Sequence, residues 1–396
     1  MRKNIVMVGG LAFEDSSSSI KTTIELSKYF KILYVEGRVP FYRALKRKQI
    51  YRWFKLLIKS LKRAKPQQID NNLLIISLFK LPLFPYSFPS TVLKFNNYIN
   101  LKRIKKWIKK LGIEENLVLY HWNWMFADFM GALGEKYNIY QCRDANDKHM
   151  HLKNSKYGNY ILENEARMFK KGINKTFVFT KSLQEELITR HGENCDIEVL
   201  PNAVDYDFFR ETITRHGEKK YSGLDEIKSP RILYCGGINE RLDMQLIYDL
   251  AERNKNWTFI FYGGTSIPVK TDIRNVKFMG RADRSDIPVI MNKCDVGIMN
   301  YVKSDFTSFI DPLKMTEYLA SGLPIVSSSI NSVKVFNQQN ENILFLADSF
   351  EEWQKAIEKA IVLKNNGDFI KKALSIAEKN SIEHKCKKIK NYIDAL

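Results

Sequence analysis

The chain has 396 residues, of which 44% are hydrophobic and 12% aromatic. This composition excludes an intrinsically disordered protein and leaves room for two ordinary domains. A formal net charge of +19 indicates an anionic partner, namely a membrane surface, a nucleic acid or a charged substrate. The five cysteines are odd in number and include no C-x-x-C pair, which argues against a disulfide framework and favours the reducing cytoplasm.

The first half of the chain alternates short apolar runs with helical segments, which is typical of a parallel doubly wound sheet. The opening run breaks at Gly9-Gly10, so we interpret it as a strand rather than a signal peptide. The loop that follows, with Phe13 and Glu14, carries no G-x-G-x-x-G motif, so a dinucleotide cofactor is not expected. Strands are expected at residues 4–8, 32–35, 117–120, 139–143 and 175–180.

Polar and aromatic residues follow two of these strands. His121 and Trp122 come directly after residues 117–120, and Asp144 comes directly after residues 139–143. Open α/β sheets bind ligands at the carboxyl ends of their strands, which makes these residues candidates for a ligand site. The alternative for Asp144 is that it caps the next helix. His149 and His151 lack the further partners that a metal ion needs, so no metal site is expected.

Residues 41–65 contain no acidic residue and place apolar side chains at helical spacing among lysines and arginines. Such a cationic amphipathic helix suits the plane of an anionic bilayer. The run at residues 102–110 repeats this chemistry, and the proline-aromatic loop at residues 81–90 is suited to insert at the interface or to grip a lipid. Two alternatives remain: the apolar stripe packs on the N-terminal sheet, or the basic face binds nucleic acid, which the helical spacing of Trp and Phe disfavours. The stripe consists of Ile50, Trp53, Phe54, Leu57 and Leu61.

A second alternation of strands and helices is expected after residue 230. Its strands are expected at residues 231–234, 258–262, 276–280 and 295–300. The polar, charged stretch before it is expected to be a linker. Gly236 and Gly237 follow the first of these strands, where a backbone without side chains is able to approach a phosphate. Arg241 is either a second phosphate-binding cation or a surface arginine.

The most informative stretch is residues 310–328, which read IDPLKMTEYLASGLPIVSS. Asp311 is the expected N-cap of a helix that begins at Pro312 and stops at Gly322. Lys314 and the first amides of the helix are suited to bind a diphosphate, and Glu317 is suited to accept the hydroxyls of a ribose. The plainer interpretation is a capped helix with a solvated Lys–Glu pair.

This stretch resembles the donor-binding motif of bacterial GT-B glycosyltransferases, a PLK-x-x-EYLA-x-G-x-P-x-V run. The resemblance implies that Lys314 contacts the diphosphate of a nucleotide sugar and that Glu317 contacts its ribose. Many retaining relatives carry a second glutamate where this chain has Phe309, and Asp311 is expected to take part of that role. Residues 234–243 and 275–280 match the Y-x-G-x-I-x-x-x-x-D and N-V-x-F-x-G patterns of the same family. The remaining donor-binding residues that the resemblance implies are Gly236, Gly237, Arg241, Gly280 and Tyr301.

The implied fold is α/β: a GT-B enzyme with two Rossmann-like, doubly wound domains and an interdomain cleft. The resemblance assigns residues 1–205 to an acceptor-binding domain, 206–230 to a linker and 231–375 to a nucleotide-sugar-binding domain. A last helix at residues 376–396 crosses back to the first domain. The acceptor-facing residues in this scheme are Phe13, Glu14, His121 and Trp122.

Residues 140–147, YQCRDAND, are similar to an Asp-bearing turn of the family, with Ala145 where many relatives have a second aspartate. In the xanthan glucuronosyltransferase branch, which the chain resembles more distantly, the matching aspartate is the proposed base. Asp144 is therefore expected to act as general base if the enzyme inverts, and to position the acceptor if it retains.

The expected function is metal-independent sugar transfer from a nucleotide diphosphate donor, a UDP-sugar, to a lipid-linked or polysaccharide acceptor in cell-surface glycan synthesis. No cofactor and no nucleic-acid partner are expected. The enzyme is expected in the cytoplasm, attached peripherally to the inner face of the cell membrane through its basic N-terminal domain. The alternatives are a sugar-nucleotide epimerase of the same fold and a non-catalytic basic protein that binds nucleic acid.

Overall fold

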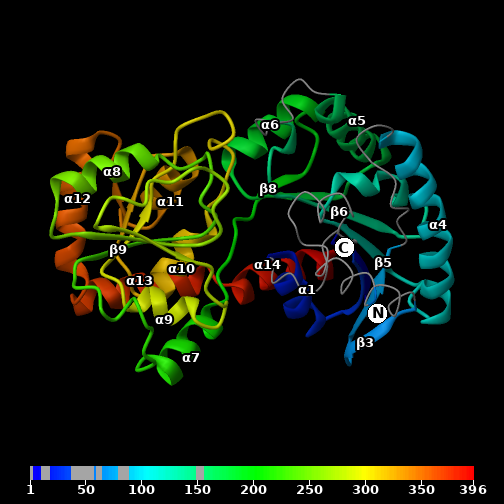
Figure 1. The fold of residues 1–396 in the computed structure, drawn as a ribbon. Coiled ribbons are helices and arrows are strands. Elements are labelled where there is room, and N and C mark those ends of the chain that lie inside the picture. The colour runs from blue at the N-terminus through cyan, green and yellow to red at the C-terminus, as the bar shows by residue number, and fades with distance from the viewer. Residues whose placement is uncertain (1–2, 10–17, 37–57, 59–64, 79–88, 149–155) are drawn as a thin grey trace. The chain divides into compact units, whose positions relative to one another are not determined.

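The computed structural model describes residues 3–9, 18–36, 58, 65–78, 89–148 and 156–396 (Figure 1). The chain divides into two compact units. Unit 1 comprises residues 1–201 and 386–396, and unit 2 comprises residues 202–385. Several predicted features lie wholly or mostly outside the described residues, namely Phe13, Glu14, His149, His151, the basic stretch at 41–65 and the loop at 81–90.

Unit 1 is built on a sheet whose described part has eight strands in the order β3-β4-β2-β1-β5-β6-β7-β8. The β3–β4 pair is antiparallel, and the other neighbouring pairs are parallel. Its central strands are almost continuous Val, Ile and Leu runs because helices cover both faces of a parallel sheet. The strands are β1 (Asn4–Val8), β2 (Lys31–Glu36), β3 (Gln67–Asp70), β4 (Leu73–Ser77), β5 (Leu117–His121), β6 (Tyr137–Cys142), β7 (Lys175–Val178) and β8 (Ile197–Val199).

Helices cover this sheet, with α1 and α14 on one side and α4 and α5 on the other (Figure 1). The C-terminal end of α14 packs on unit 1, where the Tyr392 hydroxyl donates to the Asn174 carbonyl at 3.1 Å. No helix among the described residues is both long enough and apolar enough to cross a membrane. The helices are α1 (Ser18–Ser27), α4 (Pro89–Lys110), η1 (Trp124–Phe129), η2 (Asn146–Lys148), α5 (Lys156–Lys171), α6 (Lys181–His191) and α14 (Ile382–Ala395), which belongs to unit 1 from Cys386 onward.

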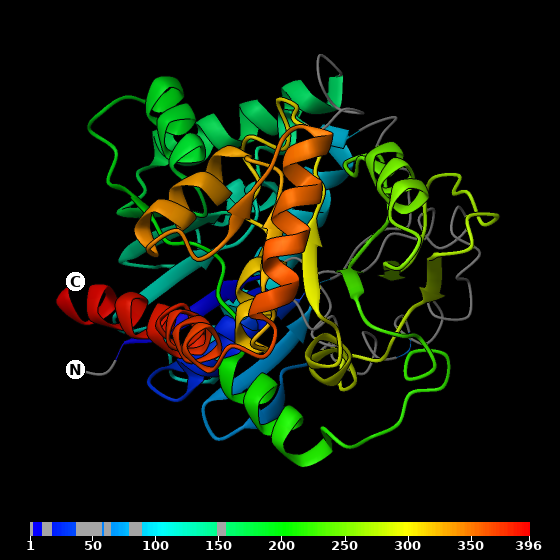
Figure 2. The same ribbon diagram turned by 90° about the vertical axis from the view of Figure 1, so that its left-hand side faces the viewer.

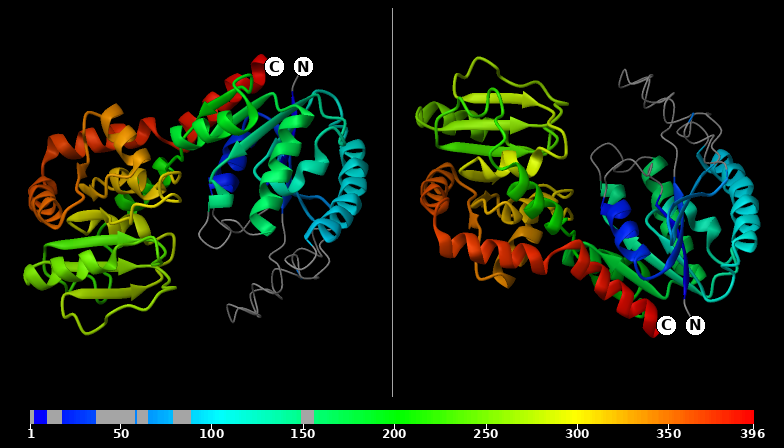
Figure 3. Two further views of the ribbon diagram at one scale, coloured as in Figure 1. Left: turned by 90° about the horizontal axis from the view of Figure 1, so that it is seen from above. Right: turned by 90° about the horizontal axis from the view of Figure 1, so that it is seen from below.

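Unit 2 has a six-stranded, fully parallel sheet in the order β11-β10-β9-β12-β13-β14. Helix α12 crosses in front of these strands in Figure 2, and Figure 3 shows the layers of the unit from above and below. The prediction of two doubly wound α/β sheets is therefore confirmed. The elements are β9 (Arg231–Cys235), β10 (Thr258–Tyr262), β11 (Val276–Gly280), β12 (Val296–Met299), β13 (Ile325–Ser327), β14 (Phe345–Leu346), α7 (Tyr206–His216), α8 (Met244–Arg253), α9 (Ile287–Asn292), α10 (Leu313–Ala320), α11 (Asn331–Gln339), α12 (Phe350–Leu363) and α13 (Gly367–Lys379).

The stretch expected to be a linker, residues 206–230, is instead part of unit 2. It begins with α7, in which Phe209 is buried and Arg210 donates to the Ala320 carbonyl at 3.3 Å. Only one face of α7 packs on the unit, so the segment keeps the polar composition that suggested a linker.

The single helix expected at residues 376–396 is two helices, α13 and α14. The chain leaves the helical conformation between them, where Val204 pairs with it. The Val204 amide donates to the Asn380 carbonyl at 3.1 Å, and the Ile382 amide donates to the Val204 carbonyl at 2.9 Å. Helical hydrogen bonding is interrupted there because these backbone groups pair with another segment.

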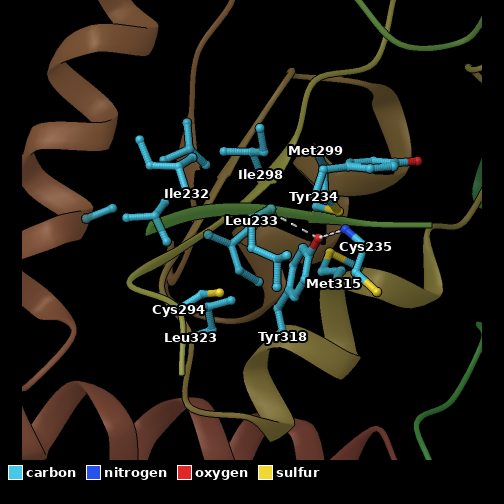
Figure 4. Close-up of a cluster of buried hydrophobic side chains, with 14 of the residues drawn as sticks. Ile232, Leu233, Tyr234, Cys235, Cys294, Ile298, Met299, Met315, Tyr318 and Leu323 are labelled. Atoms are coloured by element: carbon cyan, nitrogen blue, oxygen red, sulfur yellow. Dashed lines mark hydrogen bonds between the residues drawn. The ribbon is translucent and has the colours of Figure 1, made fainter. Parts of the chain in front are cut away.

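Tyr318, on α10, joins this helix to β9 (Figure 4). Its hydroxyl donates to the Leu233 carbonyl at 3.3 Å and accepts the Cys235 amide at 2.9 Å. The side chain is completely buried, and a Cβ at Gly297 in β12 would lie 2.7 Å from the Tyr318 ring. Glycine is therefore required at residue 297, and the hydrogen bonds fix the position of α10 on the sheet.

The end of α10 matches the prediction. Gly322 has a φ of +69°, and its amide donates to the Leu319 carbonyl at 2.9 Å. The Leu323 amide donates to the Tyr318 carbonyl at 3.0 Å. These two bonds form a Schellman motif, which satisfies carbonyls that a helix end leaves free.

We predict that Tyr318→Phe lowers the free energy of unfolding of unit 2 by about 1–3 kcal/mol, because a buried amide loses its hydrogen-bond partner. Tyr206→Phe, at a partly buried position of α7, is the matched control and should change it by less than about 0.5 kcal/mol. Urea unfolding of the full chain measures both values. Equal losses in the two variants would show that the hydroxyl of Tyr318 does not hold α10.

Candidate functional site

The loop before α10 differs from the prediction at the first residues of the helix. The N-cap is Pro312, and the helix begins at Leu313. The Asp311 carboxylate accepts the Asn202 backbone amide at 2.6 Å, and the Asn202 side-chain amide donates to the Asp311 carbonyl at 3.1 Å. The expected N-cap at Asp311 is therefore wrong. This carboxylate ties the loop to the first residue of unit 2.

Lys314 lies against the backbone of the loop that follows β9. A Cβ at Gly236 would lie 2.3 Å from the Lys314 Cε and 2.6 Å from its Nζ. The φ of Gly236 is +152°, which also favours glycine. The Lys314 Nζ is 5.1 Å from the centroid of the Tyr234 ring, within cation–π range. Glycine at residue 236 thus leaves the space that the lysine occupies.

The charge of Lys314 is stable in this position. Burial alone would lower the pKa of the ammonium, but Tyr301, Tyr234 and Glu317 raise it, and the net pKa lies above its ordinary value. The residue keeps part of its surface exposed to solvent. Unit 2 therefore holds a permanent positive charge at the carboxyl end of β9.

The carboxyl ends of β9, β10 and β11 meet in a layer of glycines. The Gly236 amide donates to the Tyr262 carbonyl at 2.8 Å, and the Gly263 amide donates to the Gly280 carbonyl at 2.7 Å. A Cβ at Gly263 would lie only 1.8 Å from the Gly236 carbonyl oxygen. The backbones of adjacent loops approach this closely because no side chain separates them.

Arg241 is a second cation in the loop after β9. Its Nε donates to the Asn239 Oδ1 at 3.0 Å, and its guanidinium carbon lies 5.9 Å from the centroid of the Phe306 ring. A bridge between Leu242 and Tyr301 joins this loop to the segment before α10. Arg241 is thus oriented by its neighbours and is partly exposed.

Glu317 lies one turn after Lys314 on α10 and is partly exposed. Burial, together with the nearby Glu317 carboxylate, raises the pKa of the Cys235 thiol to about 12, which places this negative charge near the end of β9. The structure therefore gathers most of the predicted unit 2 residues around one strand end. They are Gly236, Gly237, Arg241, Tyr301, Lys314 and Glu317, with Gly280 at the end of β11.

Arg281 belongs to the same edge of the sheet, and sequence reasoning did not select it. A Cβ at Gly264 would lie 2.9 Å from its Nε and from its Nη2, so the guanidinium packs on the loop after β10. The available signal was the Gly263-Gly264 pair after a predicted strand. That pattern shows a close approach but does not show which side chain makes it.

His121 and Trp122 are buried in unit 1 and do not form an open loop. His121 is the last residue of β5, and neither of its ring nitrogens has a hydrogen-bond partner among the described residues. Burial and the Lys171 ammonium lower the pKa of His121 to about 3, so the imidazole is neutral. The Trp122 ring lies 5.8 Å from the Arg143 guanidinium. His121 ends β5, an inner strand of the sheet, and Trp122, the residue after it, is 3% exposed.

Asp144 follows β6 and is partly exposed in the bend before η2. The Cys142 thiol donates to the Asp144 carbonyl at 3.8 Å, which ties the bend to the strand end. Farther along the turn, the Asp147 carboxylate lies 2.7 Å from the Arg190 Nη2. Asp144 is therefore a carboxylate at the carboxyl end of a strand, on a turn with fixed ends.

No group of three or more His, Cys, Asp or Glu side chains within the described ranges is arranged to hold a metal ion. The candidate ligands of the first half, His149 and His151, lie outside these ranges.

Comparison with known proteins identifies relatives of both the sequence and the fold. Residues 229–362 match the family model of the Glycosyl transferases group 1. TuaH of Bacillus subtilis (strain 168), named for a glycosyltransferase role in teichuronic acid biosynthesis, is 28% identical over 178 residues. That match covers 43% of this chain and 44% of TuaH, so it spans less than half of either protein.

Two solved structures resemble the whole chain. Sucrose-phosphate synthase from Thermosynechococcus elongatus has a TM-score of 0.68 at 12% identity, with 100% of both chains covered. Anabaena HepE in complex with UDP has a TM-score of 0.62 at 13% identity, with 99% of this chain and 100% of HepE covered. The chain therefore has the two-domain, Rossmann-like fold of the GT-B glycosyltransferases, and residues 229–362 carry the group 1 sequence pattern.

We predict that acidification destabilises unit 1 through His121. The pKa of His121 is about 3 in the folded state and about 6.5 in an unfolded chain. Between these pH values the unfolded state binds one more proton at His121 than the folded state. The contribution of the neutral imidazole to the free energy of unfolding is therefore fully present above pH 6.5, and it falls by about 1.4 kcal/mol per pH unit below pH 6.5. Urea unfolding at several pH values should show that His121→Phe loses this part of the slope. The exposed control His216→Gln should keep it, and an unchanged slope in His121→Phe would contradict the assignment.

Proposed function

We propose that this chain is a glycosyltransferase that moves a sugar from a nucleotide diphosphate donor, a UDP-sugar, to a lipid-linked or polysaccharide acceptor in cell-surface glycan synthesis. The observation that carries the proposal is the Lys314 ammonium, which lies on the Gly236 backbone where β9 ends and α10 begins. The group 1 family match over this region and the UDP bound by the structurally similar HepE support a nucleotide-sugar donor.

In the proposed reaction, the bond between the sugar C1 and the diphosphate oxygen breaks, and UDP leaves with the bonding electrons. Lys314 and Arg241 stabilise the negative charge that develops on the leaving diphosphate. The first amides of α10 add a partial positive charge. Glu317 accepts the hydroxyls of the ribose. The raised pKa of Lys314 keeps its charge present throughout the physiological pH range.

A new bond forms between C1 and the acceptor oxygen, whose proton passes to Asp144 if the reaction inverts. The partly exposed position of Asp144 at the carboxyl end of β6 supports this role. In a retaining reaction Asp144 would position the acceptor instead. The two cations of unit 2 supply the charge that the leaving group needs, so the proposed reaction uses no metal ion and no further cofactor.

Calorimetric binding of UDP tests the space that Gly236 leaves for Lys314. Gly236→Ala places a methyl group where the Lys314 side chain lies, so the Kd for UDP should rise about tenfold or more, as in Lys314→Ala. Gly367→Ala, at the first residue of α13 and outside the proposed site, is the matched control, because no other segment of the chain lies within 4 Å of its new Cβ. Its Kd should stay within about twofold of the wild type.

The same measurement with Glu317→Ala tests the ribose contact. This variant should weaken UDP binding and leave the binding of inorganic pyrophosphate unchanged. If UDP, GDP, ADP and CMP all fail to bind the wild type, the glycosyltransferase proposal is wrong.

The basic side of α4 supports attachment of unit 1 to the inner, cytoplasmic face of an anionic membrane. The helix contains no acidic residue, and its opposite side is buried through Asn97, Ile104 and Ile108. Phe95 and Tyr98 are 50% and 56% exposed on the basic side. Each lysine near an anionic surface contributes about 1 kcal/mol to binding. The exposed lysines are Lys94, Lys102, Lys105, Lys106, Lys109 and Lys110.

Co-sedimentation with vesicles of phosphatidylglycerol and phosphatidylcholine at low salt tests this surface. Replacing Lys102, Lys105, Lys106 and Lys109 by Gln should weaken binding by at least about tenfold. The matched control replaces the same number of exposed lysines on α12 and α13 of unit 2, namely Lys355, Lys359, Lys371 and Lys379. Equal binding by both variants would exclude α4 as the membrane surface. Retention of single-stranded DNA at physiological salt, without vesicle binding, would favour the nucleic-acid alternative.

A further inference from the structure

We propose that Arg190 is a positioning residue that fixes the turn carrying Asp144. The inference rests on the proposed function, because it assigns Asp144 the role of base or acceptor-positioning group. Arg190 lies near the end of α6, and Asp144 lies on the turn between β6 and η2. The two residues are linked by ion pairs and hydrogen bonds that converge on this turn.

Arg190 is the centre of a largely buried ionic network. Its Nη2 lies 2.7 Å from the Asp147 Oδ2 and 2.6 Å from the Glu186 Oε1, and its Nη1 lies 3.3 Å from the Glu165 Oε2. The exposed side-chain fractions are 19% for Arg190, 11% for Asp147 and 6% for Glu165. A planar guanidinium with several donors is able to hold all three carboxylates, and a lysine ammonium matches this geometry less well.

The carboxylate of Glu165 connects this network to β6. It accepts the Tyr140 hydroxyl at 3.1 Å, and the Cys142 thiol lies 3.9 Å from it. Tyr140 and Cys142 lie on the same face of β6, and Cys142 is the last residue of this strand, which leads to Asp144. Arg190 therefore bridges a carboxylate anchored on the strand, Glu165, and a carboxylate on the turn, Asp147.

The turn between these anchors is short and closed by its own bonds. The Lys148 amide donates to the Ala145 carbonyl at 3.0 Å, and the Lys148 Nζ lies 3.2 Å from the Glu186 Oε1. The Cys142 thiol contacts the Asp144 carbonyl at the other end. Asp144 thus lies between Cys142, at the end of β6, and Asp147, in η2. Arg190 holds Asp147 through the ion pair.

Loss of Arg190 would leave the carboxylates of Asp147, Glu165 and Glu186 facing one another without their shared cation. Like charges in a largely buried site repel strongly. The turn would move to separate the charges, and Asp144 would move with it. Because donor binding belongs to unit 2, the structure predicts lower turnover without weaker UDP binding.

Arg167 provides the matched control. It lies on α5 of the same unit and forms an ion pair with Asp128 of η1, which the Asn97 side-chain amide also contacts at 2.9 Å. Arg167→Met therefore removes a guanidinium from a partly buried ion pair in unit 1 without removing a contact to η2. It reproduces the general destabilisation that Arg190→Met causes.

The experiment measures UDP release by the full chain, with the best donor from UDP-glucose, UDP-galactose, UDP-N-acetylglucosamine and UDP-glucuronate. We expect Arg190→Met to lower kcat by on the order of 10- to 100-fold, because a small displacement of a catalytic group is costly. The Kd for UDP should stay within about twofold of the wild type. Arg190→Lys should recover part of the loss, and Arg167→Met should keep near wild-type kcat at temperatures well below its Tm.

A double-mutant cycle tests whether Arg190 acts through Asp144. Asp144→Asn should lose turnover while keeping UDP binding, and adding Arg190→Met to it should cause no further loss. If Arg190→Met and Arg167→Met have the same kcat, or if the two losses multiply, Arg190 does not position Asp144. If Asp144→Asn keeps wild-type turnover, the proposed role of Asp144 and the inference fail together. If no donor is turned over and UDP does not bind, the proposed function itself fails.

Discussion

The proposed donor site depends on the close approach of one cation to a backbone that carries no side chain. The Lys314 Nζ lies within 2.6 Å of the place where a Cβ at Gly236 would be, and Gly263 allows the next loop to pack on Gly236 in turn. A side chain at either glycine would force these groups apart. The charge is therefore held in place by packing before any ligand binds, which is the arrangement that electrostatic catalysis requires.

Helix α10 carries both Lys314 and Glu317, so the position of this helix decides where their charges lie. Tyr318 fixes the helix to β9 through two buried hydrogen bonds, and Asp311 ties the preceding loop to Asn202. In unit 1, the turn after β6 is likewise fixed by a contact from another segment. Here the ion pair between Arg190 and Asp147 has the part that the Tyr318 hydroxyl has in unit 2. In both units the candidate functional residue lies next to the contacts that fix its segment in place.

The strands were predictable because buried parallel strands are continuous apolar runs whose pattern is local. All strands expected from the sequence are present, and so is the helix that ends at Gly322. The sequence prediction was wrong at residues 206–230, where only one face of α7 packs and the composition stays polar. It was also wrong at Asp311, whose carboxylate binds a distant amide although its position in the sequence suits an N-cap.

The sequence by itself determined the α/β class, the order of the strands along the chain and the residue types at the candidate site. These features follow from local periodicity, from glycine and proline chemistry and from a motif in one continuous stretch. The tertiary structure decided which groups meet: Asp311 with Asn202 across 109 residues, and Arg190 with Asp147 across 43. Such contacts depend on how separate strands and helices pack. A local sequence pattern therefore does not predict which two distant polar residues will be in contact.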